Sequence, residues 1–266
     1  MIGHVTVADI KEAAKAAKSK VWESAAEYGR EPKIYLHWTA GHYNQTSDSY
    51  HVNIKGNGDI WQTRNFTETT DGTWRRNSGA INLTICGCFD ATSNNLGSEP
   101  PTADQIEEMA KVIAAVAEGL GIPVDKQHVM THGEAADNED GLEPHEAYGP
   151  LNGCERWDLE YLGTPESPRY NPRATDGTRG GDVLRGKANW YLNGGEKSSE
   201  NQTINQTIIE RYQTIDDVPE WGKEAVQNSI RRGILKGTGD GLDIDVKDLR
   251  YIVWLDRGLT WLNSMV

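Results

Sequence analysis

Basic residues are scarce in this sequence. The 27 Lys and Arg stand against 40 Asp and Glu, which gives a formal net charge of −13. Nucleic-acid binding depends on broad contact between basic side chains and phosphates, so this balance argues against a nucleic-acid partner. Bulk charge also does not draw such a chain to an anionic surface, and binding there would need a specific recognition site.

Cysteines and long apolar runs are equally rare. The three cysteines, Cys86, Cys88 and Cys154, are too few for a disulfide framework, and we expect reduced, buried thiols. Cys86 and Cys88 alternate on a predicted strand and should face the same side of it. Residues 1–20 hold no apolar stretch behind a basic start, so we expect neither a signal peptide nor insertion into a membrane.

The apolar pattern predicts helices and strands in mixed order over the first part of the chain. Helices are predicted over residues 7–28 and 102–120, the second with a capping box at Thr102 and Gln105 and a C-cap at Gly121. Strands are predicted over residues 33–38, 80–88 and 129–131, and a hairpin over 50–62. Because the two kinds of element do not alternate strictly, we expect an α/β fold with a mixed central β-sheet flanked by helices.

The composition changes after Tyr191. Residues 193–207 contain Gly-Gly, Ser-Ser and a repeated Asn-Gln-Thr, which is typical of a polar linker. Helical spacing of apolar residues resumes over 218–232 and 248–262. We therefore predict a first domain over residues 1–190, a linker over 191–213 and a small helical C-terminal domain over 214–266.

Three residues stand at positions suited to metal chemistry. His37 and His132 each end an apolar run, and Asp158 follows Arg156-Trp157. Two imidazoles and one carboxylate can hold Zn²⁺ and leave its fourth position for water. A water molecule so placed is a hydrolytic nucleophile at neutral pH, so the sequence predicts a zinc hydrolase.

Four motifs in a fixed order carry a family resemblance over residues 30–162. They are His37-Trp38-Thr39-Ala40-Gly41, residues 49–62 with Ser49-Tyr50-His51, Thr131-His132-Gly133-Glu134, and Arg156-Trp157-Asp158. This set resembles the zinc-dependent N-acetylmuramoyl-L-alanine amidases, a group that includes phage lysozymes, bacterial type 2 amidases and peptidoglycan recognition proteins. The resemblance implies the fold of that group and cleavage of the amide between N-acetylmuramic acid and L-alanine in bacterial cell-wall peptidoglycan.

The resemblance also implies roles for single residues. His37, His132 and Asp158 match the zinc ligands; some members use Cys as the third ligand, and Cys154 is the alternative here. Tyr50 matches a tyrosine whose hydroxyl assists catalysis, and we expect it to hydrogen-bond the attacking water or the oxyanion. Arg156 stands where the family often has a catalytic Lys, and a guanidinium can only stabilise negative charge there.

The general base is less clearly marked. The strand over 80–88 offers Thr84 where one branch of the family carries a catalytic Glu. Glu134 is the nearest carboxylate to a ligand in sequence, and it could act as base or orient an imidazole. We expect His51 to pack or hydrogen-bond inside the fold. The acid-rich run over 134–146 lacks the alternation of a calcium loop and predicts a solvated segment.

The tail carries a second resemblance. Residues 216–221, 233–237 and 249–250 resemble a single S-layer-homology module, a class that commonly acts in wall attachment. One such copy has a small core, which favours self-association or docking. Taken together, the two resemblances predict a phage endolysin. Such a protein stays in the host bacterial cytoplasm until lysis and then reaches the cell wall. The alternatives are a non-catalytic peptidoglycan recognition module and a host autolysin.

Overall fold

The computed structural model describes residues 2–142, 149–151, 156–195, 212 and 214–236, with nine further positions between 242 and 259. The chain divides into two compact units, Met1–Lys197 and Ser198–Val266. Cys154 and most of the predicted linker lie outside the described residues. No helix among the described residues has both the length and the apolar character needed to cross a membrane.

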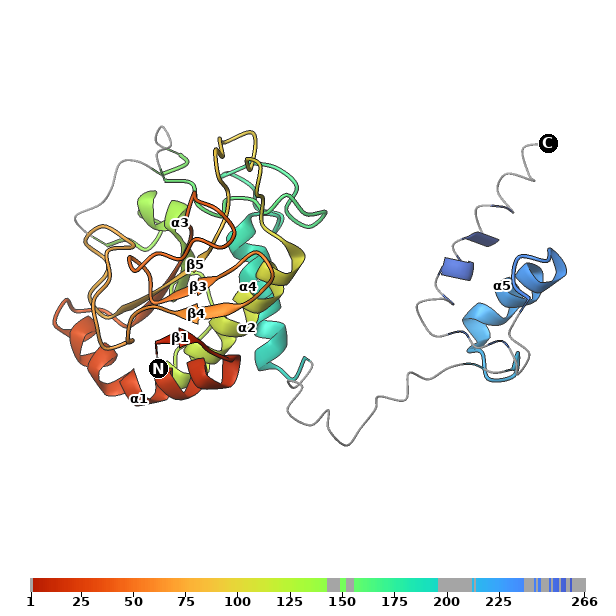
Figure 1. Ribbon diagram of the computed structural model, residues 1–266, viewed down its shortest axis with the longest axis horizontal. Helices are drawn as coiled ribbons and strands as arrows, with labels where there is room; N and C mark the ends of the chain where they lie inside the picture. Colours follow the sequence, from red (N-terminus) through yellow and green to blue (C-terminus); the bar gives the residue numbers. More distant parts are fainter. Residues whose placement is uncertain are drawn as a thin grey trace. The chain divides into compact units, whose positions relative to one another are not determined.

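The first unit is built on a six-stranded mixed sheet with the order β1-β4-β3-β5-β2-β6 (Figure 1). Its strands are β1 (Gly3–His4), β2 (Lys33–Trp38), β3 (Val52–Ile54), β4 (Ile60–Gln62), β5 (Ala80–Ile85) and β6 (Val129–Thr131). The pairs β2–β5, β2–β6 and β3–β5 are parallel, whereas β1–β4 and β3–β4 are antiparallel. The α/β fold with a mixed sheet and flanking helices is therefore confirmed.

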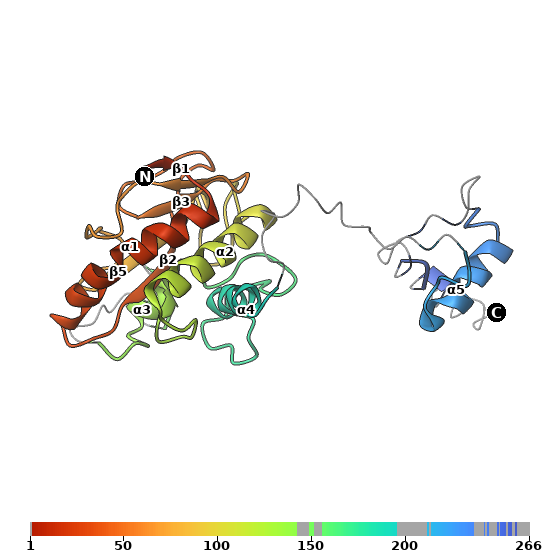
Figure 2. The same cartoon turned by 90° about the horizontal axis from the view of Figure 1, so that it is seen from below.

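Four described helices accompany the sheet: α1 (Val7–Ala26), α2 (Ala103–Leu120), α3 (His132–Ala136) and α4 (Gly180–Leu192). Helices α1 and α2 run side by side, and α4 lies against α2 (Figure 2). Trp22 of α1 donates its indole N–H to the carbonyl of Leu120 at 2.9 Å. Gln105 of α2 donates to the carbonyls of Ile54 and Cys86, which ties this helix to the ends of β3 and β5.

The predicted helices over 7–28 and 102–120 are confirmed as α1 and α2. The capping box of Thr102 and Gln105 is present, and Gly121 closes α2 with φ 71°, in the left-handed region. The strand predicted over 80–88 ends at Ile85, and Cys88 has φ 61°. Cys86 and Cys88 are both free and buried, but they do not share one face of a strand.

The second unit has a small apolar core of its own. Helix α5 (Glu220–Arg231) packs with a cluster formed by Tyr212, Val218, Val226, Ile244 and Leu249. The backbone of Tyr212 pairs with that of Ile244 at 2.8 Å. Asp256 accepts hydrogen bonds from the side chains of Asn228 and Arg232 beside this core.

Candidate metal centre and its cleft

The sheet brings the two histidines to the same edge. β2 and β6 are parallel neighbours with Leu36 opposite Thr131, so the next residues, His37 and His132, both lie at the carboxyl ends of their strands. His132 is also the first residue of α3, whose N-cap is Thr131. Asp158 reaches the same place from the turn over 157–160.

The three side chains converge on one point. His37 Nδ1 lies 3.2 Å from His132 Nδ1, and Asp158 Oδ2 lies 3.6 Å from each of these nitrogens. Ligands about 2.0 to 2.1 Å from a tetrahedral zinc ion are about 3.3 to 3.4 Å apart. All three residues are buried. In the described part of the chain, they are the group of side chains whose donor atoms lie close enough together to hold a metal ion. The donor types and their spacing therefore fit a zinc ion.

The orientation of His37 is fixed from behind by polar contacts. Its Nε2 lies 2.8 Å from Asn82 Oδ1, while Asn82 Nδ2 donates to Thr70 and Asn77. These contacts assign Oδ1 as the acceptor, so Nε2 of His37 carries the proton and Nδ1 presents a lone pair to the metal position. Thr73 donates to the same Asn82 oxygen at 3.0 Å.

Burial and the interactions among the three side chains set the protonation of His37 and Asp158. Burial lowers the pKa of His37, and this outweighs the opposing effect of Asp158, so the imidazole stays neutral. Burial alone would raise the pKa of Asp158, but the adjacent His132 and His37 imidazoles favour its ionised form more strongly, so its pKa lies below its usual range. A neutral imidazole and an ionised carboxylate are the forms that bind a metal.

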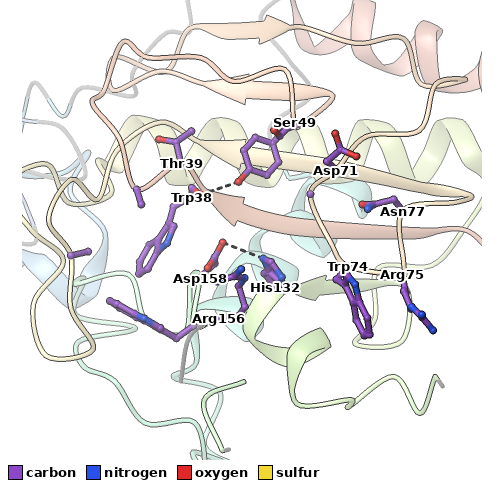
Figure 3. A pocket seen from close by; sticks show the side chains of 15 residues that line it. Trp38, Thr39, Ser49, Asp71, Trp74, Arg75, Asn77, His132, Arg156 and Asp158 are labelled. Carbon is purple, nitrogen blue, oxygen red and sulfur yellow. Dashed lines mark hydrogen bonds and ion pairs between the residues drawn. The ribbon is translucent and has the colours of Figure 1, made fainter. Parts of the chain in front are cut away.

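A cleft of about 680 Å³ opens beside the three side chains (Figure 3). Trp38 and Trp157 form one wall, with their ring centroids 4.6 Å apart in an edge-to-face contact. The loop with Asp71 and Trp74 borders the cleft across from Trp38. Its volume is in the range of small-ligand sites, and its aromatic walls suit a substrate with flat faces.

Tyr50 and Arg156 both line this cleft. The Tyr50 ring lies 4.8 Å from the His37 ring, and its hydroxyl is 3.5 Å from the carbonyl of Trp38. Burial and the nearby Asp158 raise the pKa of Tyr50, so its phenol is a hydrogen-bond donor at neutral pH. Arg156 is exposed at the cleft, where its charge can act on a bound substrate.

Glu134 does not have the surroundings of a general base, contrary to one of the roles expected from the sequence. Its carboxylate accepts two hydrogen bonds from Arg185, at 2.7 and 2.8 Å, and one from the backbone of Thr131. It is 1% exposed and does not line the cleft. The acid-rich run is likewise not wholly solvated, because Asp140 is buried against Arg76 at 2.8 Å.

Some residues of the site lie outside the motifs that were recognised in the sequence. Asn82 is one of them, although the alternation of polar Asn82 and Thr84 with apolar neighbours on β5 was a usable signal for an inward polar face. His51 is buried, as expected: it accepts from the backbone of Asn82 and donates to the carbonyl of Glu68. The partner of Glu134, Arg185, gave no signal, because it pairs over a long sequence separation.

Residues 4–146, more than half of the chain, match the model of the N-acetylmuramoyl-L-alanine amidase family. The chain therefore belongs to this family. Among curated proteins, no sequence matches it.

The solved structures found to be similar to part of this chain share little sequence with it. The hydrolase AmiA of Staphylococcus aureus is 16% identical, with a TM-score of 0.37 over 64% of this chain and 79% of its own. The amidase endolysin LysCS of Clostridium intestinale is 16% identical, with a TM-score of 0.31 over 46% and 78%. Drosophila PGRP-LB is 15% identical, with a TM-score of 0.32 over 46% and 92%. The family assignment follows from the sequence match alone.

Proposed function

We propose that the chain is a zinc-dependent N-acetylmuramoyl-L-alanine amidase that cuts the bond between N-acetylmuramic acid and L-alanine in peptidoglycan. The observation that carries this proposal is the convergence of His37 Nδ1, His132 Nδ1 and Asp158 Oδ2 beside an open cleft. In a chain of this family, such a donor set supports a zinc centre that hydrolyses an amide. A bound zinc ion would supply Lewis acidity and lower the pKa of a water molecule.

The chain's own residues would bind the substrate and stabilise charge. Trp38 and Trp157 offer aromatic surface for the sugar and peptide portions. The Tyr50 hydroxyl is placed to donate to the oxyanion that forms at the cleaved carbonyl, and Arg156 adds positive charge at the same cleft. Asn82 keeps the His37 ring in its working orientation.

The test is the chemistry of the products released from purified peptidoglycan. New amino termini on L-alanine without new reducing sugars are expected for the wild type, and neither product is expected for His132→Ala. His128→Ala is the matched control, because His128 pairs with Asp125 and Glu31 and does not line the cleft. New reducing sugars would contradict the proposal, and wall binding with neither product would favour a recognition protein.

The biological setting proposed for this activity is a phage endolysin that remains in the host cytoplasm until the membrane fails. A catalytic unit followed by a separate small unit supports this setting, since the second unit is free to bind the wall or another copy. Expression inside a bacterial host should cause lysis only after the membrane is permeabilised. Lysis without permeabilisation would favour an autolysin.

A further inference from the structure

Helix α4 contributes two buried arginines to the neighbourhood of the metal centre. Arg179 is the N-cap residue of α4, and Arg185 lies six residues further on, which is about one and two-thirds turns. Their side chains are only 6% and 7% exposed. Buried guanidinium groups need ionic or hydrogen-bonding partners, and each finds some of them on a segment that carries a candidate metal ligand; Arg179 also pairs with Glu139, and Arg185 with Asp182.

Arg185 holds the segment of His132 from both sides. It donates to both carboxylate oxygens of Glu134, at 2.7 and 2.8 Å, and to the carbonyl of Val129 at 2.9 Å. Val129 begins β6, and Glu134 closes the capping box at the start of α3. The first residue of the strand that leads to His132 and the first turn of the helix that begins at His132 are therefore tied to one guanidinium.

Arg179 holds the segment of Asp158 in the same way. It donates to both carboxylate oxygens of Glu160, at 3.1 and 2.7 Å. The backbone N–H of Gly180 donates to the Glu160 carbonyl at 3.0 Å, and the N–H of Glu160 closes a turn on Trp157. That turn contains Asp158.

The start of α4 packs too closely against these segments for a larger side chain. A methyl group at Gly180 would lie 2.0 Å from the carbonyl oxygen of Leu159. A methyl group at Gly181 would lie 2.9 Å from both Arg185 Nη1 and Glu134 Oε2. The two glycines thus allow the helix to touch the backbone next to Asp158 and the ion pair next to His132.

We propose that α4 braces the metal centre, with Arg179 and Arg185 as positioning residues that fix Asp158 and His132 at their ligand spacing. The inference rests on the proposed function, because it concerns the affinity of the same site for zinc. A metal site tolerates little displacement of its ligands, so residues that hold them contribute to affinity without touching the ion. The brace lies beyond the residues that match the family, which end at 146.

A wedge variant tests this brace with little risk to folding. Gly181→Ala places its methyl group 2.9 Å from the side-chain ends of Arg185 and Glu134 and 3.0 Å from Thr131 Cγ2, so these side chains must shift, whereas a methyl group at Gly186 of the same helix meets no atom within 4 Å. Gly181 lies in the first turn of α4 and Gly186 in its interior, so Gly186→Ala controls for an added methyl group on the same helix. We expect Gly181→Ala to raise the zinc dissociation constant about 10- to 100-fold, as loss of an outer partner of a ligand does, and Gly186→Ala to leave it unchanged. The readout is competition with a chromophoric chelator on the folded chain.

A second set of variants separates the positioning role of Arg185 from its contribution to the stability of the fold. Arg185→Met should weaken zinc binding, and Arg185→Lys should restore part of it by keeping one charged donor. Leu184→Ala is the control, because Leu184 is buried on the same helix in the apolar core. It should lower the melting temperature of the metal-free chain while keeping the zinc affinity.

Equal zinc affinity in wild type, Gly181→Ala and Arg185→Met would overturn the brace. So would equal losses of affinity in Arg185→Met and Leu184→Ala, since these would reflect stability alone. A wild type that takes up no zinc would contradict the proposed function itself, and the brace with it. If the wild type binds zinc and cuts peptidoglycan, and Gly181→Ala binds zinc as tightly as the wild type, the brace alone is contradicted.

Discussion

At the residue scale, single polar atoms determine the orientation and the tautomer of His37. His37 can present Nδ1 to a metal because Asn82 occupies its Nε2, and Asn82 is itself held by Thr70 and Asn77. A histidine without such a partner could exchange tautomers or rotate, and its lone pair would have no fixed direction. The orientation of His37 therefore depends on residues outside the set of three candidate ligands.

Removal of the Tyr50 hydroxyl should affect catalysis and little else. We expect Tyr50→Phe to lower kcat about 100-fold, the usual loss when one oxyanion donor is removed, with KM and zinc content nearly unchanged. Tyr43→Phe is the control, because the Tyr43 hydroxyl donates to Pro100 and does not line the cleft. The measurement is steady-state release of amino termini from a soluble muropeptide. Full activity in Tyr50→Phe would remove this residue from the catalytic group.

His51 should make the fold sensitive to acid. Burial lowers its pKa from 6.5 to about 4, so between these values the unfolded chain binds a proton that the folded chain does not. Stability from this residue is complete above pH 6.5 and falls by about 3 kcal/mol as the pH drops to 4. Urea unfolding of wild type and His51→Gln with a chelator present measures the effect: their difference should shrink below pH 6.5. A difference that stays constant down to pH 4 would contradict it.

The sequence singled out His37 and His132 because each stood at the end of an apolar run, and Asp158 because it followed Arg156-Trp157. The structure brings the three side chains together as expected. For Glu134 the sequence left two roles open, general base or orienting group, because closeness in sequence does not show where a side chain points. Its carboxylate turns toward Arg185, which is 51 residues away in the chain.

At the scale of elements, strong local signals gave correct predictions and weak ones did not. Helices α1 and α2 have capping boxes and an apolar stripe, and both were predicted close to their observed ends. α4 contains Gly180, Gly181 and Gly186 and a buried Arg185, so neither propensity nor periodicity marked it. Tertiary ion pairs stabilise this helix, and no local pattern reports such pairs.

Gln105 shows how one side chain joins two kinds of element. Its amide donates to the carbonyls of Ile54 and Cys86, and it is fully buried. Gln105→Leu should lower the free energy of unfolding by about 2 to 3 kcal/mol, because the buried Cys86 carbonyl loses its donor, the Ile54 carbonyl keeps only the Cys86 N–H, and the capping bond to Thr102 is lost. Exposed Gln127→Leu should cost under about 0.5 kcal/mol in the same urea titration. Equal costs for the two variants would show that the bridge between α2 and the sheet contributes little.

At the scale of the whole molecule, each unit has a separate apolar core. Deletion of residues 198–266 should therefore leave zinc content and cleavage of soluble muropeptides intact. Binding to intact walls should weaken about tenfold or more, because the second contact and its avidity are lost. Sedimentation of both forms with purified walls provides the measurement. Unchanged sedimentation of the shortened chain would exclude wall attachment by the tail.

The most direct test of the central claim is a zinc titration of the metal-free chain with bound metal and new L-alanine amino termini measured together. We expect hydrolysis to rise in proportion to bound zinc and to level off at one equivalent per chain. His132→Ala should neither hold that equivalent nor cut peptidoglycan. Hydrolysis by the chelated wild type, or one bound zinc without hydrolysis of peptidoglycan, would contradict the claim that His37, His132 and Asp158 form the centre of a zinc amidase.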